Sequence, residues 1–176
     1  MEQLSPTAYV ILGMLGWRPM SGYDIKAIVD HSTRFFWAAS YGQIYPELRR
    51  LADAGLVEGE AQQESGRRRT AYSLTAAGRE ALQGWLAREP RTFEQRDEGL
   101  LKLFFAAAAP ETAAATLDAK RAYHEGKLEQ LREIEAGAKP EGFTGLVLRY
   151  GIESSEWMVD WCEREAARLR KPEARR

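Results

Sequence analysis

Two short segments of this chain of 176 residues carry side chains suited to binding a polyanion. The first is Gly66-Arg67-Arg68-Arg69, in which three guanidinium groups follow a glycine. Arginine forms paired hydrogen bonds with phosphate oxygens or with guanine, and a narrow minor groove attracts it. On a strand, alternation sends Arg67 and Arg69 to one side and Arg68 to the other. The segment is suited to contacting a nucleic-acid backbone, although by itself it is equally typical of a solvated surface hairpin.

The second segment, residues 40–54, combines an apolar stripe with a polar face. Ile44, Leu48 and Leu51 recur at helical spacing and predict a helix that buries one side. The opposite face carries side chains that can hydrogen-bond to bases or phosphates: Ser40, Tyr41, Gln43, Tyr45, Glu47, Arg49 and Arg50. Glutamine can bond to adenine through two atoms, and arginine can read guanine or neutralise a phosphate. Such a helix is suited to reading a major groove.

Two helices are predicted to precede this segment and to position it. Ser5-Pro6 is typical of a helix start, and the apolar run that follows predicts a buried helix ending near Gly16. Ser21 and Asp24 form a capping-box pattern, with Asp in place of the usual Glu or Gln. We therefore expect a second helix from Ser21 to about Arg34.

The third helix has its own start and stop signals. Ser40 and Gln43 are capping-box partners, and Gly55 is suited to the left-handed conformation that ends a helix. Pro46 fits only a first turn or a kink, so the regular helix is predicted to begin nearer Gln43.

A hairpin and a fourth helix are predicted to follow. Leu56-Val57 begins an extended segment, Ser65-Gly66 is a turn signal, and Tyr72 and Leu74 alternate on the returning strand. Thr75 then caps a fourth helix that runs to Leu86.

The order helix, helix, helix, hairpin, helix is the outline of a winged helix-turn-helix. The expected fold is mainly α, with this unit and its two-stranded β wing over residues 1–90 and an α-helical domain over residues 91–176. In such a unit the third helix enters the major groove of double-stranded operator DNA, and the hairpin meets phosphates or the minor groove. The expected DNA contacts are Ser21, Tyr23, Ser40, Tyr41, Gln43, Tyr45, Arg49, Arg67, Arg68 and Arg69.

Several of these segments resemble the PadR family of bacterial transcriptional regulators. The resemblance rests on five motifs with consistent spacing: Ser21-Gly22-Tyr23-Asp24-Ile25, the run from Gly42 to Leu51, Gly55-Leu56-Val57, Gly66-Arg67, and the run from Tyr72 to Arg79. It implies sequence-specific DNA binding and transcriptional regulation. The wing departs from the family pattern, because Arg68 stands where proline is frequent and Thr70 where a basic residue is frequent.

The second half predicts three helices. After a polar join at Arg91–Gln95, a short buried helix is expected around residues 100–105, then a long helix over Glu111–Ala136 and a final one over Phe143–Leu169. Long helices with narrow apolar stripes need a partner helix or a second copy of the chain to cover them. The run from Arg96 to Phe105 resembles the C-terminal helical domain of the longer, ligand-sensing PadR proteins, which implies a homodimer.

Aromatic side chains suggest a pocket for a small aromatic or lipophilic effector. Flat rings can sandwich such a molecule, and the candidates are Phe36, Trp37, Tyr150, Trp157 and Trp161. The alternative is ordinary core or dimer packing, which is usual for aromatic residues at helical spacing. The hypothesis is a repressor whose ligand changes the angle between the C-terminal helices, and with it the separation of the two reading heads. In the family, some members respond to phenolic acids and others to lipophilic drugs.

Composition excludes several other classes. The net charge is −1, there is a single cysteine, and there are two histidines. No disulfide framework, metal site, cofactor, catalytic constellation, signal peptide or membrane span is therefore expected, and the compartment is expected to be cytoplasmic. His31 suits the end of the second helix, His124 lies beside the seam of the long helix, and Cys162 is expected to be a small buried residue. The remaining alternative is a winged helix that binds protein instead of DNA, which would require an apolar contact face.

Overall fold

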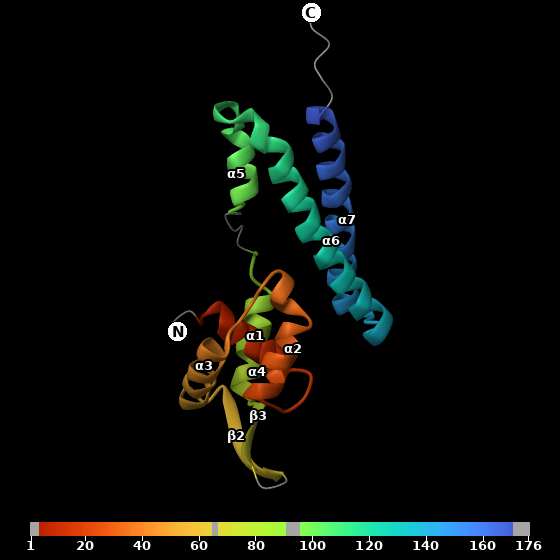
Figure 1. Ribbon diagram of the computed structural model, residues 1–176. Helices are drawn as coiled ribbons and strands as arrows, with labels where there is room; N and C mark the ends of the chain where they lie inside the picture. The colour runs from red at the N-terminus through yellow and green to blue at the C-terminus, as the bar shows by residue number, and fades with distance from the viewer. Residues whose placement is uncertain (1–3, 65–66, 91–95, 171–176) are drawn as a thin grey trace, which may run out of the picture. The chain divides into compact units, whose positions relative to one another are not determined.

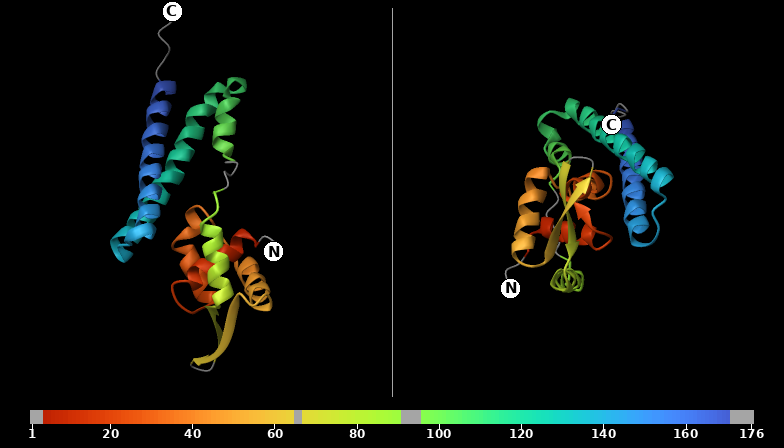
Figure 2. Two further views of the ribbon diagram at one scale, coloured as in Figure 1. Left: turned by 180° about the vertical axis from the view of Figure 1, so that it is seen from behind. Right: turned by 90° about the horizontal axis from the view of Figure 1, so that it is seen from below.

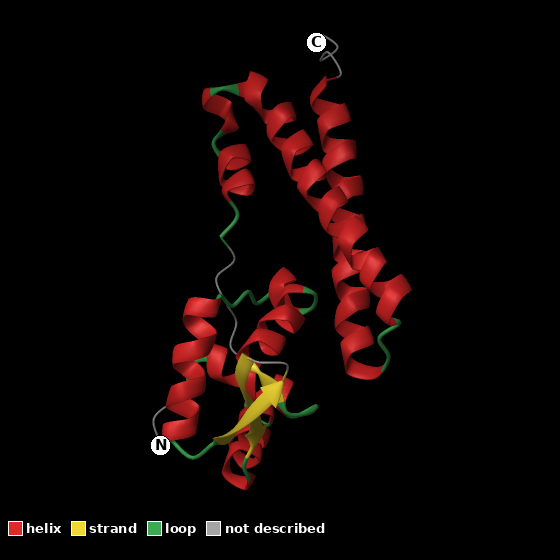
Figure 3. Ribbon diagram, turned by 60° about the horizontal axis from the view of Figure 1, so that its bottom comes forward, coloured by secondary structure: helices red, strands yellow, loops and turns green. Residues whose placement is uncertain are grey.

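A computed structural model describes residues 4–64, 67–90 and 96–170, with only the backbone at 62–64, 67 and 68. The chain forms two compact units, Met1–Thr92 and Phe93–Arg176. All the described strands belong to the first unit (Figure 3). The elements of the first unit are α1 (Pro6–Leu15), β1 (Met20–Ser21), α2 (Gly22–Asp30), η1 (Thr33–Phe35), α3 (Tyr41–Asp53), β2 (Val57–Glu64), β3 (Arg67–Leu74) and α4 (Ala76–Leu86).

The core of the first unit lies between its helices. α1 packs against both α3 and α4, and the β2–β3 hairpin projects from the helices (Figures 1 and 2). Ile11, Ile25 and Ile44, from three different helices, are all fully buried. The predicted cap of α1 is confirmed, because the Ser5 hydroxyl accepts the Ala8 N–H at 3.0 Å. The winged-helix order of elements is likewise as predicted.

The wing contains one strand that the sequence did not reveal. β1 is two residues long and pairs antiparallel with β3, Met20 opposite Tyr72 and Ser21 opposite Ala71. β2 pairs with the other edge of β3, from Val57 opposite Leu74 outward. The sheet order is therefore β1-β3-β2. Ser65-Gly66, the predicted turn, lies outside the described residues.

Two predicted helix boundaries were wrong. α2 ends at Asp30, not near Arg34, because the Ser32 hydroxyl donates to the Ile28 carbonyl at 2.6 Å and a 3₁₀ turn follows. α3 begins at Tyr41, not nearer Gln43, and therefore holds Pro46 in its second turn. Proline there removes one helical hydrogen bond. Gly55 has φ of 69°, the predicted left-handed stop.

All the secondary-structure elements described in the second unit are helices, joined by short loops (Figure 3). It consists of α5 (Glu98–Phe104), two 3₁₀ turns, η2 (Ala106–Ala108) and η3 (Pro110–Thr112), α6 (Ala113–Ala138) and α7 (Gly142–Arg170). α6 and α7 pack along one another. No described helix is both long enough and apolar enough to cross a membrane.

The prediction of a buried α5 was wrong for the single chain. Four apolar side chains of this segment are exposed: Leu100, Leu101, Phe104 and Phe105. α5 packs against α6, and its Leu103 also packs against the buried cluster of Leu117, Cys162 and Ala166. An apolar sequence marks a surface to be covered, and the described residues leave the other four side chains uncovered.

The start of α4 should tolerate no side chain at Gly78. A Cβ there would lie 2.0 Å from the Leu56 carbonyl oxygen, whereas one at Gly84, in the same helix, would meet nothing within 4 Å. We expect Gly78→Ala to lower the free energy of unfolding by about 1–3 kcal/mol. Gly84→Ala should raise it by about 0.5–1 kcal/mol, because alanine favours the helix. Urea unfolding followed by circular dichroism measures both, and equal effects of the two changes would contradict this packing.

Candidate nucleic-acid interface

The polar face of α3 is exposed as the sequence predicts. Ile44 and Leu48 are fully buried, whereas Tyr41, Tyr45 and Arg49 are exposed on the helix surface. Glu47 departs from the prediction, because it is half-buried and accepts the Ser5 hydroxyl proton at 3.0 Å. The Arg50 guanidinium also lies 3.6 Å from the Glu47 carboxylate. Glu47 therefore anchors α3 to the start of α1 rather than contributing a free carboxylate to the polar face.

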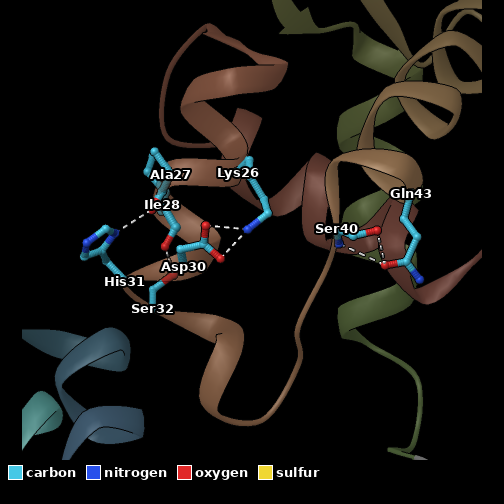
Figure 4. A network of polar contacts seen from close by, with 8 residues as sticks. All are labelled: Lys26, Ala27, Ile28, Asp30, His31, Ser32, Ser40 and Gln43. Carbon is cyan, nitrogen blue, oxygen red and sulfur yellow. Dashed lines mark hydrogen bonds and ion pairs between the residues drawn. The ribbon is translucent and has the colours of Figure 1, made fainter.

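Gln43 caps α3 and also points to its surface. Its amide oxygen accepts the Ser40 N–H at 2.9 Å and the Ser40 hydroxyl at 3.2 Å (Figure 4). These bonds use both lone pairs of that oxygen. The paired recognition of adenine predicted for Gln43 needs the oxygen as an acceptor. In this arrangement Gln43 offers its amide nitrogen alone, as a donor, unless Ser40 releases it.

Three tyrosines stack across the start of α2 and α3. The rings of Tyr23 and Tyr41 are 6.5 Å apart with planes 22° from parallel, and those of Tyr41 and Tyr45 are 6.1 Å apart at 20°. Gly22 makes room for this stack, since a Cβ there would lie 2.8 Å from Cε1 of Tyr45. The sequence analysis named each of the three tyrosines but did not predict that their rings stack. The one sequence feature that could have suggested the stacking is Gly22, which leaves room for the Tyr45 ring.

Cations lie over two of these three rings, Tyr23 and Tyr41. The Arg69 guanidinium is 5.5 Å from the centre of the Tyr23 ring, and the Lys26 ammonium is 5.3 Å from that of Tyr41. Lys26 also forms an ion pair with Asp30, one turn along α2 (Figure 4). Sequence reasoning missed Lys26, because its orientation toward α3 depends on how the two helices pack.

The capping box of α2 is confirmed, and it changes the role of Ser21. The Ser21 hydroxyl accepts the Asp24 N–H at 3.2 Å, and the Asp24 carboxylate accepts the Ser21 N–H at 3.0 Å and its hydroxyl proton at 2.6 Å. These bonds from Ser21, aided by the charge of Arg69, hold the pKa of Asp24 below its ordinary value. Ser21 is 8% exposed. Its polar atoms serve the fold, so the geometry gives no support to a DNA contact by Ser21.

The wing presents Arg69 on its exposed surface. Arg69 lies opposite Gln62 on β2, two residues outward from the last β3 residue that pairs with β1. Arg67 and Arg68 continue β3 toward the tip, paired with Glu64 and Gln63. Their side chains lie outside the described atoms, so the predicted contacts of these two arginines stay predictions.

The aromatic residues predicted to line an effector pocket fall into two groups. Phe36 is exposed and Trp37 half-buried in the first unit. In the second unit the Trp157 and Trp161 rings stack at 6.2 Å and 15°, while Tyr150 on the same helix is exposed. The rings of Trp157 and Trp161 are in contact, and the effector pocket expected from all five aromatic residues stays a prediction.

A half-buried histidine lies on α6, the helix that packs along α7 to form a seam of apolar side chains. His124 is seven residues from each of the buried Leu117 and Leu131, so it lies at the seam. Its Nδ1 is buried and has no hydrogen-bond partner among the described residues. Burial, together with the nearby charges of Lys120 and Lys127, lowers the pKa of His124. Burial also lowers the pKa of Lys127.

Cys162 lies on α7 within the same seam. It is fully buried, as predicted, and burial raises the pKa of its thiol. A raised pKa keeps the sulfur in the unreactive thiol form. Within residues 4–64, 67–90 and 96–170, no three histidine, cysteine or acidic side chains gather in a way that would hold a metal ion.

An ion pair ties the start of α5 to α6. Asp97 caps α5 by accepting the Leu100 N–H at 3.0 Å, and its carboxylate pairs with Lys120. Burial by itself would raise the pKa of Asp97, but the bonds from Lys120 and Leu100 outweigh it and lower the pKa. His31 lies at the end of α2, where its Nδ1 is 2.8 Å from the Ala27 carbonyl oxygen (Figure 4).

Comparison with known proteins gives matches to both halves of the chain. Residues 11–84 match the transcriptional regulator PadR-like family, and residues 95–170 match the virulence activator alpha C-terminal family. The negative transcriptional regulator PadR of Bacillus subtilis is 32% identical over 179 residues, covering 93% of this chain and 97% of that protein.

Solved structures of the same Bacillus subtilis protein share the fold. Its complex with operator DNA has a TM-score of 0.81 at 30% identity, covering 92% of this chain and 98% of that one. Its complex with p-coumaric acid has a TM-score of 0.77 at 29% identity, covering 95% and 98%.

The capping box of α2 should make stability depend on pH. The depressed pKa of Asp24 means that the stability it contributes is complete above its ordinary pKa of 3.8 and is lost as pH falls through the lower folded value. We expect Asp24→Ala to cost about 1 kcal/mol at pH 7, the value of a helix cap, and less near pH 3. Urea unfolding at both pH values measures this. Asp53→Ala, which removes an exposed carboxylate of α3, is the control; an equal cost of Asp24→Ala at both pH values would contradict the assignment.

Proposed function

Because this chain belongs to the PadR-like family of transcriptional regulators, which bind DNA, we propose that it acts as a homodimeric repressor that a small aromatic or lipophilic molecule releases from operator DNA. The observation that carries the DNA-binding surface is the exposed polar face of α3 beside Arg69 of the wing. A winged helix that binds protein would need an apolar face there, and this face carries tyrosine, glutamine and arginine instead.

We assign different tasks to the residues of this surface. Gln43 and Arg49, on the exposed side of α3, are placed to contact base edges in the major groove. Tyr23, Tyr41 and Tyr45 offer hydroxyl groups, and Ser40 offers its own once Gln43 moves; these suit phosphates. The wing arginines Arg67, Arg68 and Arg69 suit phosphates or the minor groove.

The exposed apolar surface of α5 supports the proposed homodimer. Phe104 is 81% exposed and Phe105 62%, with Leu100 and Leu101 beside them. Large apolar side chains grouped on one helix mark an interface rather than a solvated surface. A two-fold dimer also places two reading helices about 34 Å apart, one turn of DNA, so that each contacts one half of a near-palindrome.

Repression and release by an effector are supported by the Bacillus subtilis relative. That protein is named a negative regulator and has been solved with operator DNA and with p-coumaric acid. In this chain the stacked Trp157 and Trp161, with Tyr150 on the same helix, are the proposed aromatic lining in the second unit, and Phe36 and Trp37 of the first unit stay separate candidates. A ligand that changes the angle between the C-terminal helices would change the spacing of the reading heads and lower affinity.

Binding to the chain's own promoter region tests the assigned contacts. Arg69→Ala should weaken binding to operator and scrambled DNA alike and reduce the log–log salt slope of the dimer by about 1.8, one phosphate contact in each subunit. Gln43→Ala should instead lower the ratio of operator to scrambled affinity, by up to about tenfold. Fluorescence anisotropy at several salt concentrations measures both.

Two control variants separate reading from folding. Ser40→Ala removes one of the two bonds to the Gln43 oxygen and keeps the Gln43 amide nitrogen as a donor, so it should not lower the ratio of operator to scrambled affinity. Arg164→Ala removes an exposed charge of the second unit and should change neither quantity. The opposite pattern for Gln43 and Arg69 would contradict the assignment, and a wild-type chain that ignores its promoter in low salt would favour the protein-binding winged helix.

The oligomeric state tests the proposed dimer. We expect the wild-type chain to sediment as a dimer at micromolar concentration and Phe104→Glu to sediment as a monomer, because a buried carboxylate without a partner is costly. The monomer should bind promoter DNA at least tenfold more weakly, having one reading head. Leu86→Glu, at an exposed leucine of α4, is the control and should remain dimeric. A wild-type chain that sediments as a monomer would overturn the homodimer.

A further inference from the structure

The pairing of β3 with β1 ends at Ala71, two residues from Arg69. β3 is paired on both edges only at Ala71 and Tyr72, where β1 lies opposite. Outward from Ala71, β3 pairs with β2 alone, and the hairpin becomes a ribbon of two strands. An isolated two-stranded ribbon has marginal stability in water. Its direction relative to α3 must therefore be set by contacts between its side chains and the helices.

One described contact of this kind joins the outer ribbon to the helices, between Arg69 and Tyr23. The guanidinium lies 5.5 Å from the ring centre, within the range of a cation–π interaction. The charge of Arg69 also contributes to lowering the pKa of Asp24, the residue after Tyr23.

Tyr23 is in turn fixed against α3. It stacks on Tyr41, the first residue of α3, which stacks on Tyr45 one turn later. Tyr45 lies over Gly22, the residue before Tyr23. Arg69 is therefore linked to the reading helix through a continuous series of ring contacts.

We propose that Tyr23 is the positioning residue that fixes the angle between the wing and α3, by holding Arg69 on its ring. This inference rests on the proposed DNA-binding function, which it deepens. The ring performs this task, and the phenol hydroxyl is left for a phosphate. The wing and α3 would then contact DNA as one rigid surface, so that Arg69 reaches its phosphate without a further loss of conformational freedom.

Hydrogen exchange in the DNA-free protein tests the positioning role directly. Tyr23→Leu should speed exchange of the outer ribbon amides, residues 61–62 and 69–70, by about two- to fivefold, the size of an exposed cation–π contact. Tyr23→Phe keeps the ring and should exchange like the wild type, as should the α1 amides in every variant. Unchanged ribbon exchange in Tyr23→Leu would overturn the proposal.

A double-mutant cycle on DNA gives the second readout. Tyr23→Leu and Arg69→Gln should each weaken binding to the promoter region about fivefold or more. The loss of affinity in the double variant should be clearly smaller than the product of the two single losses. A loss equal to that product would show that the two residues act independently and would overturn the proposal. Failure of the wild-type chain to bind DNA would defeat the proposed function, while the exchange experiment would still decide whether Tyr23 holds the wing.

Discussion

The packing of α2 against α3 at Gly22 is the constraint on which the candidate interface depends. Gly22 has no side chain, and the Tyr45 ring and the Leu48 methyl group occupy the space that a Cβ would need. The residue before it, Ser21, pairs with β3 through its backbone and caps α2 through its side chain. Sheet, second helix and third helix therefore meet within two residues. A shift at this point would move the wing and the polar face of α3 at once.

Local patterns were predicted from the sequence, and non-local ones were not. Both capping boxes were predicted, because a capping box joins residues three apart and its signal lies in the residue types themselves. β1 was missed because a strand of two residues carries no alternation, and its partner lies some fifty residues away. The tyrosine stack and the position of Lys26 follow from the packing of two helices, which no spacing within one helix specifies.

The second unit shows the same limit at the level of assembly. The narrow apolar stripes of the two long helices predicted that a partner helix or a second copy of the chain would cover them, and in the structure α6 and α7 pack along one another. The sequence did not predict that four apolar side chains would be exposed: Leu100, Leu101, Phe104 and Phe105. A pattern of apolar residues shows which side of a helix must be covered, but it does not show whether the same chain or a second chain covers it. The expectation of a homodimer came from the resemblance to the PadR family, not from the periodicity of the sequence.

The middle of the α6–α7 seam gives a physical reason why this pair of helices can change its packing. Leu117 and Leu131 are buried in this seam, and between them on α6 the buried Nδ1 of His124 has no hydrogen-bond partner among the described residues. On α7, Ser155 is fully buried and its hydroxyl donates to the Gly151 carbonyl at 2.7 Å, within its own helix. Unsatisfied polar groups weaken packing where they lie, and an apolar layer would have tightened it. Packing around His124 therefore contributes less to holding α6 against α7 than an apolar side chain would. A joint of that kind suits the proposed release mechanism, in which a ligand changes the angle between the C-terminal helices, whereas a uniformly apolar seam would resist the change.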